Sequence, residues 1–421
     1  MTRWRDWFNQ HSSAGTLAIG SVLSQGILFF STPYLTRLYG PTEYGFFSLF
    51  GMTVALLTPL CGMCLPSALA QAADERERIS LAQTGICLAI LSSFLLSILI
   101  GVVVILTDRF AEVGANSLPI WWGLAVAAAL LSIIGQFIYQ WNLLDQRFTA
   151  AACVTFTSAF ASTSSRIALG LLWPNGLMLA VGQTCGLAVA ARGLSRFNPL
   201  RTGVFFDLSL LRSYREFPLH QTWQQVINVF SRTMPIPVFT SAFGAASAGQ
   251  YAVAMLALGI AGQVIGKAIG DAALSDFVHA HRLGGGLLPV LRRSTRQLVI
   301  LGGLPFSLIL LGGPDLFAFV FGGEWREAGE FARWMAPWLF FAFLNSPSLT
   351  VINMLRQQAW ASRLNVITLA LRGAGLFIGV YVLQSAVWGV ALFAAAGLLH
   401  NASIIVGAFQ KAQQHPTRSA A

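Results

Sequence analysis

Long apolar runs alternate with short polar connections along the whole chain. Each run has roughly 20 residues, the number that a helix rising 1.5 Å per residue needs to cross a hydrocarbon core of ~30 Å. Twelve transmembrane helices are predicted, over residues 14–35, 46–70, 79–106, 118–141, 149–173, 176–193, 218–243, 250–275, 297–320, 333–355, 362–383 and 386–410. The longest connection, residues 193–217, has about 25 residues and is too short for a separate domain. The pattern therefore predicts an all-α polytopic membrane protein.

Composition and charge agree with a membrane protein. Of the 421 residues, 55% are hydrophobic and only 10% are charged, whereas soluble domains carry about 25% charged residues. If the N-terminus is inside, 18 of the 26 Lys and Arg residues lie on cytoplasmic segments, and four, Arg37, Arg109, Arg326 and Arg333, lie on the other side. This positive-inside pattern predicts that both termini lie in the cytoplasm. The net charge of +10 is thus explained by topology and contact with anionic membrane lipids, without nucleic acid as a partner.

One sequence pattern occurs twice at a constant spacing of 204 residues. Pro33, Gly40, Gly45 and Phe47 correspond to Pro237, Gly244, Gly249 and Tyr251. Six predicted spans separate the two copies, so both halves enter the membrane in the same direction and form a parallel repeat. We expect two six-helix lobes, an N-terminal lobe at 1–200 and a C-terminal lobe at 201–421. Chance recurrence of Gly and Pro at helix ends is the alternative explanation.

Two loop motifs resemble those of a known family. The first is LYGPTEYG at 38–45, and the second is FVFGGEWREAG at 319–329, followed by MAP at 335–337 and SP at 346–347. They resemble the Wzx-type oligosaccharide flippases of the multidrug/oligosaccharidyl-lipid/polysaccharide exporter superfamily. The resemblance implies alternating access and a polyprenyl-pyrophosphate-linked glycan as cargo, such as an O-antigen, lipopolysaccharide or exopolysaccharide repeat unit. A polysaccharide polymerase and chain-length proteins are the partners it suggests.

The second motif also has a structural explanation. Gly322 and Gly329 are expected to permit the turn between two spans. Trp325, Trp334 and Trp338 are expected to form an aromatic belt at the membrane interface.

Polar stripes on several predicted spans are the candidates for transport. Such stripes usually face a wet cavity or another helix, because unpaired polar groups are costly in hydrocarbon. The stripes are Gln221, Gln225, Asn228 and Arg232; Gln263, Lys267 and Asp271; Thr155, Ser158, Ser162 and Ser165 beside Arg166; and Asn365, Thr368 and Arg372. Guanidinium binds phosphate oxygens in bidentate fashion, so cations at graded depths could escort a pyrophosphate.

The predicted substrate-binding set is drawn from these stripes and comprises Arg232, Lys267, Arg166, Arg372, Asn228, Gln225 and Asp271. Alternatives remain open for several members. Lys267 and Asp271, four residues apart, could neutralise each other. Arg166 and Arg372 occupy nearly equivalent repeat positions and could share an architectural role. Gln25 and Gln136 are expected to bond between helices.

Two other functions are weighed against the flippase. A membrane glycan polymerase or ligase would need acid/base groups on a large outer loop, but the outer loops are short and the histidines, His400 included, are expected near the inside face. A cation-coupled drug exporter would be expected to bury a carboxylate in its N-terminal lobe, where spans one to six have acidic residues only at their ends. Cys61 and Cys64 have redox-motif spacing but are expected to pack inside a helix. No enzyme activity, cofactor or metal site is predicted.

Overall fold

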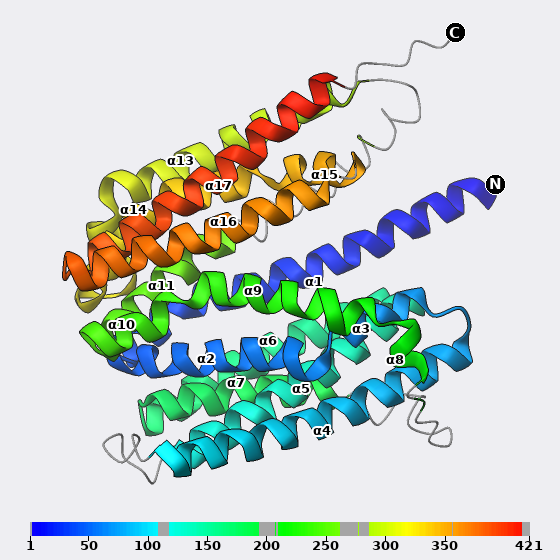
Figure 1. The fold of residues 1–421 in the computed structure, drawn as a ribbon, viewed down its shortest axis with the longest axis horizontal. Coiled ribbons are helices and arrows are strands. Elements are labelled where there is room, and N and C mark those ends of the chain that lie inside the picture. The colour runs from blue at the N-terminus through cyan, green and yellow to red at the C-terminus, as the bar shows by residue number, and fades with distance from the viewer. Residues whose placement is uncertain are drawn as a thin grey trace. The chain divides into compact units, whose positions relative to one another are not determined.

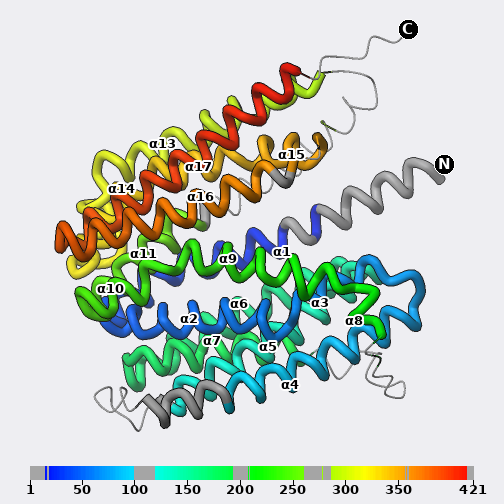
Figure 2. Tube along the Cα trace, viewed as in Figure 1, coloured from blue at the N-terminus to red at the C-terminus, as the bar shows by residue number. Residues whose placement is uncertain are grey.

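The computed structural model describes residues 2–107, 118–192, 207, 209–261, 277, 286–355 and 357–414. Within these ranges the chain is helical (Figures 1 and 2). The elements are α1 (Thr2–Leu38), α2 (Pro41–Gly62), α3 (Leu65–Ala68), η1 (Leu69–Gln71), α4 (Glu75–Thr107), α5 (Leu118–Leu144), α6 (Phe148–Leu172), α7 (Gly176–Ala191), α8 (Ser209–Ser213), η4 (Phe217–Gln221), α9 (Thr222–Thr233), α10 (Pro235–Phe243), α11 (Ala245–Ala261), α13 (Leu287–Phe321), η6 (Gly323–Trp325), α14 (Arg326–Leu344), α15 (Ser346–Met354), α16 (Gln358–Phe377), η7 (Ile378–Val382) and α17 (Ala386–Gln414). Lys267 and Asp271 lie outside the described residues.

The helices fall where the apolar runs predict them, and the all-α class is confirmed. Each predicted span coincides with a helical segment, although the span at 250–275 is described only as far as Ala261. Six helices of the described chain are long and apolar enough to cross a membrane, and the bent pair Gly323–Leu344 and Ser346–Met354 makes a seventh. Two of the remaining predicted spans coincide with shorter apolar helices, Gly176–Ala191 and Ala245–Gly259.

By its contacts the chain divides into two compact units. Unit 1 comprises Met1–Tyr39 and Phe46–Thr233, and unit 2 comprises Gly40–Gly45 and Met234–Ala421. The predicted division after residue 200 differs from this boundary, because α8, η4 and α9 belong to unit 1. Tyr214 and Phe217 explain the difference, since both are buried in the same apolar cluster as α4 and α5.

In unit 2 the antiparallel pair α13 and α14 packs against α17, which in turn packs against α16 (Figure 1). Gly322 has φ +118°, a conformation that favours glycine, so its predicted role in the turn is confirmed. Gly329 has another role: a Cβ there would collide with the carbonyl oxygen of Gly313, and a Cβ on Gly313 would lie 2.5 Å from the carbonyl oxygen of Gly329. The two glycines therefore let α13 and α14 approach closely.

The predicted tryptophan belt is wrong for two of its three members. Trp325 is 1% exposed and Trp338 is 4% exposed, so both pack inside unit 2. The Trp325 ring makes an edge contact with Tyr44, at 5.2 Å between centroids. Trp334 is exposed and donates a hydrogen bond from Nε1 to Glu330, at 3.2 Å. The motif gave no sign of this difference, because burial depends on tertiary packing: Trp325 of η6 packs on Tyr44, and Trp338 of α14 packs on Phe393.

The duplicated motif packs against itself in a reciprocal way. A Cβ on Gly45 would collide with the backbone of Ala245, and a Cβ on Gly249 would collide with the backbone of Pro41. Positions 41 and 245, like 45 and 249, are 204 residues apart. The two contacts are therefore related as in a two-fold symmetric interface, where residue i meets j and j meets i. This reciprocity supports an internal repeat over the chance recurrence of glycine.

Candidate functional site

A cavity of about 470 Å³ with both polar and apolar walls lies within unit 1. It is enclosed by α2, α3, α5, α7 and α9. Its lining residues are Phe47, Phe50, Gly51, Val54, Ala55, Thr58, Pro59, Cys64, Ser67, Ser132, Gln136, Gln183, Gln225 and Val229. Three glutamines from three different helices thus converge on one space.

The helix break between α2 and α3 forms one end of this cavity. α2 contains Pro59 and ends at Gly62, and the next two residues, Met63 and Cys64, have φ of 48° and 52°. Two successive non-glycine residues in the left-handed region cost free energy, and such strain is often found at functional sites. The carbonyl oxygen of Cys61 accepts a hydrogen bond from the Ser92 hydroxyl, at 3.1 Å. Cys64 therefore lies at the break, instead of packing inside a continuous helix as predicted.

The lining can form hydrogen bonds without any charge. Each glutamine amide offers both donors and an acceptor, and the neighbouring hydroxyls offer both as well. Phe47 and Phe50 lie 6.2 Å apart with nearly parallel rings and add apolar faces. None of the lining residues is ionisable at neutral pH, apart from the weakly acidic Cys64 thiol. Such a site suits a hydroxyl-rich neutral ligand better than a pyrophosphate.

Arg166 lies behind the Phe47 wall of the cavity. Its guanidinium carbon is 4.8 Å from the centroid of the Phe47 ring, within range for a cation–π interaction. Its backbone carbonyl accepts a hydrogen bond from the Tyr39 hydroxyl at 2.8 Å. Gly182 on α7 leaves space for it, because a Cβ there would lie 2.6 Å from the Arg166 Cγ. Arg166 is not among the lining residues.

Arg372 has a matching environment in unit 2. Only 6% exposed, it lies over the rings of Trp338 and Phe393, at 4.5 and 5.0 Å from their centroids. A Cβ on Gly397 of α17 would lie 2.5 Å from its guanidinium nitrogen. In each unit, then, an arginine lies over an aromatic ring and against a glycine of the following helix. This similarity favours a shared architectural role for Arg166 and Arg372.

The polar face of α9 is only partly in the cavity. Gln225 and Val229 line it, whereas Asn228 is half-buried and not part of the lining. Arg232 is exposed and lies seven residues beyond Gln225, about 10 Å along a helix axis. Of the predicted polar face, the structure therefore brings only Gln225 to the cavity, and Arg232 lies outside it.

Some residues of the cavity belong to no predicted stripe. Gln136, expected to bond between helices, lines the cavity, and Gln183 and Ser132 were not singled out at all. The span-five stripe instead joins two helices: the Ser158 hydroxyl donates to the carbonyl oxygen of Gly186 at 2.8 Å.

His400, expected near the inside face, belongs to α17. It lies near the middle of α17, away from the helix end, with Nδ1 2.9 Å from the Thr368 hydroxyl. Among the residues that the structure describes, no group of three His, Cys, Asp or Glu side chains could hold a metal ion.

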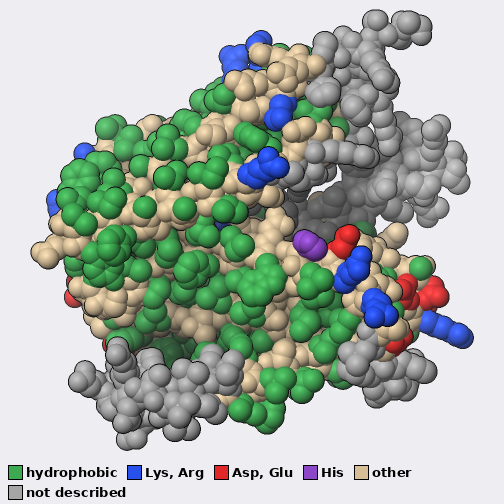
Figure 3. All heavy atoms as spheres, in the orientation of Figure 1, with side chains coloured by type: hydrophobic (Ala, Val, Ile, Leu, Met, Phe, Trp, Pro, Cys, Tyr) green, Lys and Arg blue, Asp and Glu red, His purple; other side chains and the backbone are tan. Residues whose placement is uncertain are grey.

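The outer surface is suited to lipid. Large apolar side chains cover much of the face seen in Figure 3, and the charged side chains gather mainly near the helix ends. Phe30, Leu172 and Phe319 are each about four-fifths exposed, at 80%, 78% and 81%. These exposures and the long apolar helices define a multi-pass membrane protein.

Comparison with known proteins identifies the family. Residues 34–330 match the family described as "Polysaccharide biosynthesis protein", and the chain belongs to this family. No curated protein matches the chain.

Solved structures share the fold at low sequence identity. The lipid II flippase MurJ in an inward closed conformation has a TM-score of 0.69 at 12% identity, covering 94% of this chain and 90% of that one. A transporter of the MOP superfamily from Pyrococcus furiosus has 0.61 at 13%, covering 96% of both chains. An outward-facing multidrug MATE transporter has 0.60 at 14%, covering 96% and 95%. The chain therefore has the fold that these transporters share.

Proposed function

We propose that the protein moves a polyprenyl-pyrophosphate-linked oligosaccharide from the cytoplasmic to the periplasmic leaflet by alternating access. The observation that carries this proposal is the neutral, glutamine-lined cavity of unit 1. Membership of a polysaccharide biosynthesis family supports a glycan as the cargo. We place the protein in the inner membrane with both termini cytoplasmic, on the strength of the positive-inside charge pattern.

The physical task is to lower the cost of placing sugars and an anion in hydrocarbon. A hydroxyl or amide without a hydrogen-bond partner costs several kcal/mol in an apolar medium. The amides of Gln136, Gln183 and Gln225 would replace water around the sugars. The anion would gain about 2.3 kcal/mol per charge per 100 mV on leaving a negative interior, so the membrane potential would favour export.

The pyrophosphate needs a cation that this cavity lacks. We assign that role to Arg232 and Lys267, with Asn228 as a supporting polar group and Asp271 as the carboxylate that balances Lys267 four residues away. Arg166 and Arg372 would then hold the helices around the passage through their aromatic contacts. The polysaccharide polymerase and chain-length proteins would act on the product after it has crossed.

The test replaces cavity glutamines with leucine, which has a similar volume and no hydrogen-bonding capacity. Gln136→Leu and Gln225→Leu should each slow glycan delivery by about two- to tenfold, the value of one neutral hydrogen bond of about 0.5–1.5 kcal/mol. Lipid extraction should then show the polyprenyl-linked oligosaccharide accumulating on the cytoplasmic leaflet. The matched control is Gln25→Leu on α1, outside the lining. Wild-type delivery by both cavity variants at normal abundance would rule out this site.

A cation-coupled drug exporter is the second candidate, because MATE transporters share the fold. The described cavity does not favour it, since no carboxylate is among the lining residues. If the variants changed resistance to cationic drugs and left the lipid-linked glycan unchanged, the exporter would replace the flippase.

A further inference from the structure

A second cavity lies within unit 2, where α13 turns into α14. It has a volume of about 700 Å³ and is lined by Gln250, Leu311, Pro314, Asp315, Glu324, Arg326, Glu327, Glu330 and Arg333. Gln250 on α11 anchors the turn: it donates from Nε2 to the carbonyl oxygen of Glu324 at 2.6 Å and accepts from the Ala328 amide at 2.9 Å. Because Gln250 is itself 5% exposed, the turn is held against the core of the unit.

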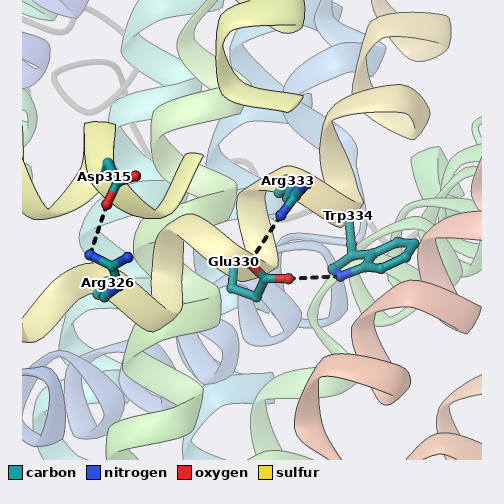
Figure 4. Close-up of polar contacts among 5 residues, drawn as sticks. All are labelled: Asp315, Arg326, Glu330, Arg333 and Trp334. Atoms are coloured by element: carbon teal, nitrogen blue, oxygen red, sulfur yellow. Dashed lines mark hydrogen bonds and ion pairs between the residues drawn. The ribbon is translucent and has the colours of Figure 1, made fainter. Parts of the chain in front are cut away.

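The charges of this cavity are arranged in pairs. Asp315 of α13 points to Arg326 of α14, at 2.8 Å, and Glu330 lies 3.9 Å from Arg333 on the same helix (Figure 4). Both arginines of the lining therefore already have a carboxylate partner. Glu324 and Glu327 remain, with no ion pair in the part of the chain that the structure describes. Four carboxylates and two guanidinium groups leave a net charge of −2.

This charge pattern selects the chemistry of a ligand. A phosphate would meet a net charge of −2 and two guanidinium groups that each already face a carboxylate, so binding of a pyrophosphate or a phospholipid headgroup would be disfavoured. An ammonium group would be attracted, and sugar hydroxyls could donate hydrogen bonds to the carboxylates. An aromatic wall adjoins the charges: the Trp334 indole donates to Glu330, and its ring lies 6.1 Å from that of Trp388. Both rings are about half exposed, at 44% and 50%. Exposed aromatic faces beside carboxylates are suited to the apolar face of a sugar ring.

We propose that the cavity between α13 and α14 binds an amino-bearing saccharide. The inference rests on the proposed flippase function, because it takes the saccharide to be the glycan part of the cargo on the outer side of the membrane. There the site would hold the sugars and reject the pyrophosphate. The return of the cargo to the cytoplasmic leaflet would be disfavoured as a result.

The test measures binding of soluble probes to the full-length protein in detergent by titration calorimetry. The probes are a glucosamine tetramer, its N-acetylated form, inorganic pyrophosphate and glycerophosphoethanolamine. We expect saturable binding of the glucosamine tetramer, about tenfold tighter than that of the N-acetylated form. Glu324→Gln and Glu327→Gln should each weaken it about tenfold, whereas Glu75→Gln, an exposed site on α4, should leave it unchanged.

Several outcomes would overturn the proposal. The first is that the glucosamine tetramer does not bind, and the second is that its N-acetylated form binds equally well. The third is that pyrophosphate or glycerophosphoethanolamine binds as tightly as the glucosamine tetramer. Binding that survives both glutamine variants would also place the saccharide elsewhere. The elution profile of each variant checks its fold. Because these probes report on unit 2 alone, failure here with a positive result for Gln136→Leu and Gln225→Leu would reject this site and retain the flippase.

Discussion

The close approach of α13 and α14 gives a prediction about stability. A methyl group at position 329 would overlap the carbonyl oxygen of Gly313 and lie 2.5 Å from the Pro314 Cα. Both obstacles are backbone atoms, so a side-chain rotation cannot relieve the overlap and the helices must separate. Overpacking of this kind costs about 1–3 kcal/mol. With no flexible atom to yield, we expect Gly329→Ala to cost about 3 kcal/mol and Gly329→Val to cost more.

The cost is large against a typical folding free energy of about 5–15 kcal/mol. For a cooperative unit of roughly 190 residues, about 3 kcal/mol corresponds to a melting temperature lower by about 6–8 °C. The assay is thermal unfolding of the detergent-solubilised protein, together with the amount of folded protein in the membrane.

Gly303→Ala is the matched control, since it lies on α13 and a Cβ there meets nothing within 4 Å. We expect that variant to be as stable as wild type or slightly more so, because alanine favours a helix. A Gly329→Ala protein that melts within about 1 °C of wild type would refute the close-approach reasoning.

Two further predictions concern transport and topology. Arg232→Ala and Lys267→Ala should each reduce surface glycan at normal protein abundance. Arg232→Lys should rescue only in part, because lysine lacks the bidentate geometry, and Lys267→Arg should retain more activity than Lys267→Gln. Wild-type delivery by both alanine variants would return these residues to packing roles. Reporter fusions after Arg212, Arg293 and Lys411 should be cytoplasmic, and fusions within 244–249 and 322–330 periplasmic. A periplasmic reporter at Arg293 would invert half of the topology.

The helices could be predicted because membrane-spanning helices must be both long and apolar. Because that constraint acts on each segment alone, every span from α1 to α17 can be recognised from its own sequence. Gly322 was predictable for the same reason, since a left-handed turn depends on one residue and its neighbours.

The cavity could not be predicted in this way, because Gln136, Gln183 and Gln225 come from three helices and only Gln225 belongs to a polar stripe. Only the packing of α5, α7 and α9 brings them together. The burial of Trp325 and the contact between Ser158 and Gly186 depend on packing in the same way. A polar stripe predicts that a helix face is not in lipid, but it does not distinguish a cavity from a neighbouring helix.

The reciprocal contact of the repeated motif limits how the two halves can diverge. Gly45 is opposed by the backbone of residue 245, and Gly249 by the backbone of residue 41. A larger residue at 45 must be accommodated by a shift of the chain near 245, and a larger residue at 249 by a shift near 41. Among aligned relatives, changes should therefore be correlated within the pairs 45/245 and 41/249, and not between the equivalent positions 45 and 249. The duplication would thus have left two separate constraints on residue size. The C-terminal half limits position 45, and the N-terminal half limits position 249.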